Sequence, residues 1–171
     1  MEKLRDTKTL AIAGMLTAIG IILGYFKVPI NQFIEIRFAF LPLAVAGMML
    51  GPGIAGVMGA LVDIGGFILY PTGPYFPGFT FSTAMAGVIF GLILYNKKVT
   101  LWRTELAMVV YTVVVGILLN SIWLNMLYLK LGYLNTIIYR LPKECIMFVV
   151  NSVLAYTVLR ALQGMKIYER V

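Results

Sequence analysis

The sequence contains no histidine and only one cysteine, Cys145. Without histidine, the chain lacks the commonest general acid–base group and the commonest metal ligand. A single cysteine excludes an intrachain disulfide and any metal site built from several cysteines. We therefore expect no metal site and no bound cofactor.

Motifs that drive common enzymatic reactions are missing as well. The chain has no GxSxG nucleophile elbow. It also never reads GxxxxGK followed by serine or threonine, so it cannot hydrolyse ATP by the P-loop route. An intramembrane enzyme built on Asp63 and Glu144 stays open as an alternative, but the sequence predicts a protein that is not an enzyme.

Charge is scarce, and apolar residues dominate. Only 12% of the 171 residues are charged and 61% are apolar, whereas soluble domains are about 25% charged and 45–50% apolar. Six apolar stretches of helical length follow one another. Backbone groups in lipid require helices or a closed barrel, and no stretch shows the long alternation of barrel strands. The sequence predicts an all-α integral membrane protein, a single domain with six transmembrane helices in one compact bundle, over residues of about 9–26, 37–50, 54–70, 80–96, 105–129 and 140–162.

The formal net charge is +7. In a membrane protein, we interpret this excess of basic residues as a determinant of topology and not as a sign of a nucleic-acid partner. With six spans and both termini in the cytoplasm, nine of the fourteen basic residues lie inside and five outside, in agreement with the positive-inside rule. Three of the outer ones, Arg37, Arg140 and Lys143, stand at helix mouths. There they can meet an anion, and arginine can bind a carboxylate through two hydrogen bonds. The alternative is that they are charges snorkelling to the interface.

Two further features place polar side chains in the interior of the predicted bundle. Arg140, Glu144, Met147 and Asn151 follow each other at spacings of four, three and four, which places them on one helical face. Asp63 interrupts an apolar span, where a carboxylate usually faces the bundle interior with a partner. We expect Asp63 either to accept a hydrogen bond from a ligand or to bond structurally to Asn120 or Asn151.

The segment from Pro71 to Phe79 has three prolines in seven residues, which restrict its backbone. A stiff loop of this kind can present Tyr75, Phe76 and Phe79 as flat aromatic surfaces at little entropic cost. Trp123 is a further aromatic candidate, unless it belongs to an interfacial belt.

The first span carries Gly14 and Ala18, a pair of small residues one helical turn apart. Such pairs allow two helix backbones to approach closely in a membrane. The pair serves either a partner protein or packing inside the bundle. The glycines of the third span, such as Gly56 and Gly59, favour internal packing.

Several short motifs resemble those of the folate-family substrate-binding components of energy-coupling factor (ECF) vitamin transporters. They are Arg37-Phe-Ala-Phe-Leu-Pro, Leu50-Gly-Pro-Gly, Gly59-Ala-Leu-Val-Asp63, Gly73-Pro-Tyr-Phe-Pro-Gly-Phe-Thr80 and Gly87-Val-Ile-Phe-Gly-Leu. Their order and spacing match from about Glu35 to Tyr95, and the six-span layout matches over the whole chain.

The resemblance implies a multi-pass protein of the prokaryotic plasma membrane that binds folate and docks on a transmembrane coupling protein with two cytosolic ATPases. The family's Ala-xxx-Ala docking motif reads Gly14 and Ala18 here, and Ala11 and Ala13 neighbour it. The candidate ligand-binding residues are Arg37, Asp63, Tyr75, Phe76, Pro77, Gly78, Phe79, Thr80, Asn120, Trp123, Arg140, Lys143 and Asn151. The alternatives are the same scaffold for riboflavin or thiamine, and a stand-alone secondary transporter.

Overall fold

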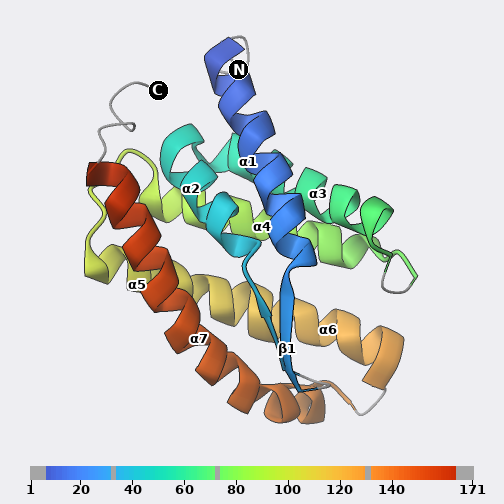
Figure 1. Ribbon diagram of the computed structural model, residues 1–171. Helices are drawn as coiled ribbons and strands as arrows, with labels where there is room; N and C mark the ends of the chain where they lie inside the picture. The colour runs from blue at the N-terminus through green and yellow to red at the C-terminus, as the bar shows by residue number, and fades with distance from the viewer. Residues whose placement is uncertain (1–6, 32–33, 72–73, 130–131, 165–171) are drawn as a thin grey trace.

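The computed structural model describes residues 7–31, 34–71, 74–129 and 132–164, and for residues 27–31, 34–37, 128 and 129 it describes the backbone alone. Within these ranges the fold is helical, with one short hairpin (Figure 1). The elements are α1 (Thr7–Tyr25), β1 (Lys27–Asn31), β2 (Ile34–Arg37), α2 (Phe40–Leu50), α3 (Pro52–Leu69), α4 (Pro77–Leu94), α5 (Leu101–Tyr111), η2 (Thr112–Leu119), α6 (Asn120–Leu124), η3 (Asn125–Leu129) and α7 (Tyr133–Gly164).

Five helical stretches of the described chain are long and apolar enough to cross a membrane. Four are α1, α3, α4 and α7, and the fifth runs from Leu101 to Leu127 through α5, η2, α6 and η3. In η2 and η3 the backbone has the wider turn of a π-helix. The sixth helix, α2, has 11 residues, a length of about 16 Å at 1.5 Å per residue, which is half of a bilayer core. The predicted all-helical membrane fold is confirmed.

The connection between the first two spans contains a feature that the sequence analysis did not predict. Strands β1 and β2 pair antiparallel, with Lys27 opposite Arg37 and Val28 opposite Ile36. The predicted second span begins at residue 37, whereas helix α2 begins at Phe40 because residues 34–37 are extended. Figure 1 shows the hairpin extending away from the ends of α1 and α2.

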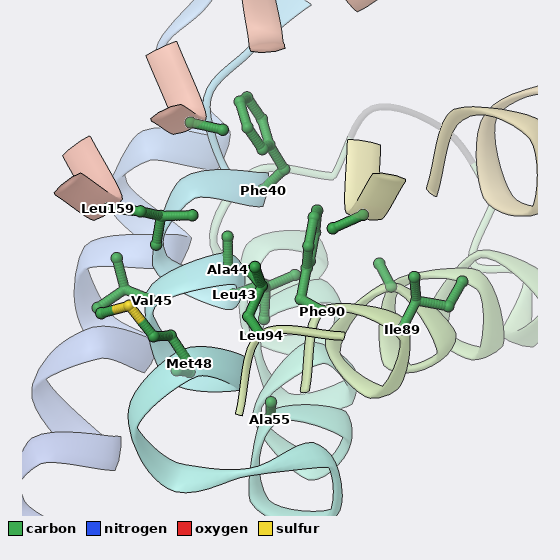
Figure 2. Close-up of a cluster of buried hydrophobic side chains, with 14 of the residues drawn as sticks. Phe40, Leu43, Ala44, Val45, Met48, Ala55, Ile89, Phe90, Leu94 and Leu159 are labelled. Atoms are coloured by element: carbon green, nitrogen blue, oxygen red, sulfur yellow. The ribbon is translucent and has the colours of Figure 1, made fainter. Parts of the chain in front are cut away.

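Helix α2 lies at the centre of the bundle and is buried on all sides. A helix that is apolar all round is typical of such a position. Figure 2 shows its residues Phe40, Leu43 and Met48 packed among side chains of the neighbouring helices. These neighbours include Phe90 of α4 and Leu159 of α7, so the core joins the two halves of the chain.

Helices α3 and α4 pack backbone to backbone through glycines. A Cβ atom on Gly59 would lie 2.9 Å from Cα of Ala84, and one on Gly87 would lie 2.9 Å from the amide nitrogen of Gly56. These contacts confirm that glycines of the third span serve internal packing. They also fix α3 against α4, which carry much of the site described next.

Candidate ligand-binding site

A cavity of about 590 Å³ opens between the helices of the first and second halves of the chain. Its walls come from α1, α2, α3 and α4 on one side and from η2, α6 and α7 on the other. Pockets for small molecules usually measure about 300–1,000 Å³ and combine apolar walls with a few polar groups. The cavity therefore suits a cofactor-sized ligand.

Most of the predicted ligand-binding residues line this cavity, although they come from separate helices and the loop before α4. The lining includes Asp63, Tyr75, Phe76, Phe79, Asn120, Arg140, Lys143 and Asn151. Four other predicted residues are not part of the lining, but each adjoins a lining residue in the chain or through a hydrogen bond: Pro77, Gly78, Thr80 and Trp123. The side chain of Arg37 lies outside the described residues; its backbone ends strand β2.

One wall is aromatic. Phe76, at the N-terminus of α4, lies 5.4 Å from Trp123 and 6.1 Å from Phe79, measured between ring centroids. Tyr75 and Phe67 are 5.1 Å apart in the same way. These rings give the cavity flat surfaces on which a planar ligand can stack.

Gly78 makes this wall possible. A Cβ atom there would collide with the ring of Phe76 and would lie 2.7 Å from Cδ2 of Trp123. Trp123 is also anchored, because its indole nitrogen donates a hydrogen bond of 2.9 Å to the hydroxyl of Ser82 in α4. The positions of the rings therefore depend on the small residue at 78 and on this hydrogen bond.

Asp63 is tied to the aromatic loop by a chain of hydroxyl groups. Thr80 donates a 2.7 Å hydrogen bond to Oδ2 of Asp63, and the hydroxyl of Tyr75 lies 2.8 Å from Oγ1 of Thr80. Since Thr80 has one hydroxyl hydrogen, which it gives to the carboxylate, Tyr75 is the donor in the second bond. The partner of Asp63 is thus Thr80, and not the Asn120 or Asn151 proposed from the sequence.

Replacing Thr80 with valine is expected to lower the free energy of unfolding by about 1–3 kcal/mol, because the charged carboxylate of Asp63 loses the hydrogen bond that Thr80 donates to it. Thr80→Ser keeps the hydroxyl and should retain most of the stability. Thermal unfolding in detergent measures both variants. A Thr80→Val protein as stable as the wild type would show that the hydroxyl chain contributes nothing.

Asn151 is the deepest polar group on the second wall. Its side chain is 7% exposed, and Oδ1 has no hydrogen-bond partner within the part of the chain that the structure describes. A buried amide oxygen without a partner is costly, so such atoms usually meet a ligand or a water molecule. Because Asn151 lines the cavity, this oxygen can accept a hydrogen bond from a bound molecule.

Arg140 and Lys143 bring positive charge to the same wall. Arg140 is tied to its own chain: Nη1 donates to Oγ of Ser121 at 3.1 Å and Nη2 to Oε1 of Glu144 at 2.9 Å. Both members of this ion pair are almost buried, with side chains 10% and 13% exposed. The sequence predicts Arg140 and Asn151 on one helical face, and α7 carries both into the cavity.

Some residues that line the cavity were not predicted from the sequence to contact a ligand. Tyr25 and Tyr70, at the ends of α1 and α3, stack with ring centroids 4.1 Å apart beside the cavity. Tyr111 and Glu144 line it as well. The tyrosines have the same sequence context as interfacial belt residues, so no local pattern distinguishes them. For Glu144 the signal was present, since it follows Arg140 by four residues.

A second surface of interest lies on α1. Ala11, Gly14 and Ala18 are exposed and lie on one face, at spacings of three and four residues. Apart from its chain neighbours and the nearby backbone of α1, no described atom lies within 4 Å of the position that a Cβ on Gly14 would take. Ala13, in contrast, is buried in the bundle. The small residues of this face are therefore not used for packing within the described chain.

Comparisons with known proteins agree on one family of transport proteins. The model for "ECF transporter, substrate-specific component" matches residues 8–160. The chain is 40% identical over 141 residues to the folate transporter FolT of Clostridium novyi, covering 82% of this chain and 81% of the relative. It is 29% identical over 159 residues to the folate transporter FolT of Leuconostoc mesenteroides, covering 90% and 85%.

A solved structure has the same fold. The crystal structure of FolT bound with folic acid superimposes with a TM-score of 0.80 at 34% sequence identity, covering 90% of this chain and 93% of that one. The similarity therefore extends over nearly the whole of both chains.

Proposed function

The chain belongs to the substrate-specific components of ECF transporters, and we propose that it binds folate and delivers it to a shared energising module. Such components are substrate-binding subunits of transporters and not enzymes. The protein is a multi-pass protein of the prokaryotic plasma membrane. Folate is assigned because two relatives are folate transporters and a structural neighbour was solved with folic acid.

Within the structure, the observation that supports this assignment is the composition of the cavity. Folate consists of a flat pterin, an aryl linker and a glutamate tail with two carboxylates. The aromatic wall offers stacking surfaces for the rings, and Arg140 and Lys143 offer cations for the tail. The unpartnered Oδ1 of Asn151 can accept a hydrogen bond from the N–H groups of the pterin edge. Arg37 is a second candidate for a tail carboxylate.

The energising module that the family implies is a transmembrane coupling protein with two cytosolic ATPases. The exposed small-residue face of α1, formed by Ala11, Gly14 and Ala18, supports the proposal that the coupling protein packs there. In lipid, close packing of small residues takes the place of the hydrophobic effect in joining helices. The buried Ala13 does not belong to this face.

Calorimetric titration of the purified protein in detergent tests the proposal. We expect folate to bind with one site per chain, and neither riboflavin nor thiamine to compete, because neither carries a carboxylate for the cationic wall. The isolated protein is expected to hydrolyse no ATP, since the chain has no P-loop. Preferential binding of another vitamin, or ATPase activity without partner subunits, would refute the assignment.

A further inference from the structure

The ion pair between Arg140 and Glu144 is built into three parts of the fold. Both residues belong to α7, and Ser121 of α6 fixes the guanidinium from the other side. The second carboxylate oxygen, Oε2 of Glu144, lies 2.8 Å from the position that a Cβ on Gly116 would occupy. A side chain at this point of η2 would push the carboxylate aside. The Glu144 carboxylate therefore lies against the backbone of η2 and is paired with Arg140.

Both members of the pair face the ligand cavity. A carboxylate of a ligand that approaches Arg140 consequently meets a guanidinium that already has a carboxylate partner. It must either share the guanidinium with Glu144, which brings two negative charges together, or displace Glu144, which leaves a nearly buried carboxylate unpaired. Both outcomes cost free energy.

We propose that Glu144 competes with the carboxylate of the ligand for Arg140, and thereby weakens binding of the anionic cargo and speeds its release. The inference rests on the proposed function, because it requires a ligand with a carboxylate. A transporter must let its cargo go, and an internal carboxylate provides a replacement partner for Arg140 when the ligand leaves. Glu144 is thus a residue that sets affinity through Arg140 and needs no contact with the ligand.

The cavity charges agree with this role. Among the described residues lining the cavity, the acids are Asp63 and Glu144 and the bases are Arg140 and Lys143. Asp63 receives its hydrogen bond from a hydroxyl, whereas Glu144 is paired with a cation. Removing the charge of Glu144 therefore removes the carboxylate that competes with the ligand for Arg140.

The test compares folate affinity in the wild type, Glu144→Gln, Arg140→Ala and the double variant. Glutamine keeps the size and the hydrogen-bond acceptor but removes the charge. We expect Glu144→Gln to tighten folate binding roughly tenfold, the scale of one charge-assisted hydrogen bond, and to slow folate dissociation. In the Arg140→Ala background the same substitution should change the affinity by less than about twofold, because the cation for which Glu144 competes is gone.

A pterin without carboxylates, 6-hydroxymethylpterin, provides the ligand control and should bind equally to the wild type and Glu144→Gln. Glu144→Ala serves as a second variant, with the same tightening expected, should the glutamine protein fold poorly. Unchanged or weaker folate binding in folded Glu144 variants would overturn the inference and leave Glu144 as a support for Arg140. A wild type that binds no folate would instead refute the proposed function.

Discussion

Replacing Gly14 with tryptophan is expected to abolish folate uptake while leaving folate binding within a few-fold of the wild type. The position is exposed, and apart from its chain neighbours and the nearby backbone of α1 no described atom lies within 4 Å of the place where a side chain would begin, so the bundle accepts the indole. On the partner side, a large ring would hold the coupling protein away from the small-residue face and prevent close helix contact. Ala18→Trp should behave in the same way.

Uptake of radiolabelled folate by vesicles that contain the complete transporter measures the effect, and calorimetry on the isolated subunit measures binding. Val153→Trp provides a matched control, because Val153 is 62% exposed and lies on α7, whereas Ala11, Gly14 and Ala18 lie on α1. This variant should transport normally. If Gly14→Trp also transports normally, the coupling protein docks on another surface.

The second large effect is expected at Arg140. A carboxylate bonded to a charged donor contributes about 1.5–3 kcal/mol, so Arg140→Ala should weaken folate binding roughly 10- to 150-fold at 1.4 kcal/mol per decade. Arg140→Lys should restore only part of the loss, since lysine keeps the charge but lacks the planar fork. Binding of 6-hydroxymethylpterin should not change if Arg140 meets the glutamate tail.

Arg140→Ala also leaves Glu144 without its cation, which lowers stability. The affinity is therefore read only from protein that unfolds thermally in a single transition. Arg37→Ala is measured alongside, because Arg37 is the other candidate for a tail carboxylate. Should neither arginine variant change the affinity threefold, both side chains are interface anchors and the placement of the anionic end is wrong.

The sequence was sufficient to predict the helical membrane fold and much of the cavity lining. Hydropathy marked each helix because the apolar runs are long and interrupted by few charges. The three prolines around Tyr75 and Phe76 marked the aromatic loop, and the lone Asp63 in an apolar span marked a polar group of the interior. Each of these signals is local in the sequence, so it can be recognised without knowing which distant residues it contacts in the fold.

What could not be predicted depends on contacts between distant segments. The π-helical turns of η2 consist of the same apolar residues as an ordinary span, so composition does not reveal them. Strands β1 and β2 have only five and four residues, and their pairing register shifts between Pro29 and Asn31. The Thr80 partner of Asp63 and the fit of Glu144 against Gly116 exist only because α3, α4, η2 and α7 are brought together.

The central claim, that this protein binds folate, is tested most directly by letting vitamins compete for it. The purified protein is incubated with an equimolar mixture of folate, riboflavin, thiamine and biotin, washed, and denatured to release what it holds. The absorbance spectrum and mass of the released molecule identify it. The account predicts folate at about one molecule per chain, as expected for a single cavity of this size; release of another vitamin, or of none, would contradict it.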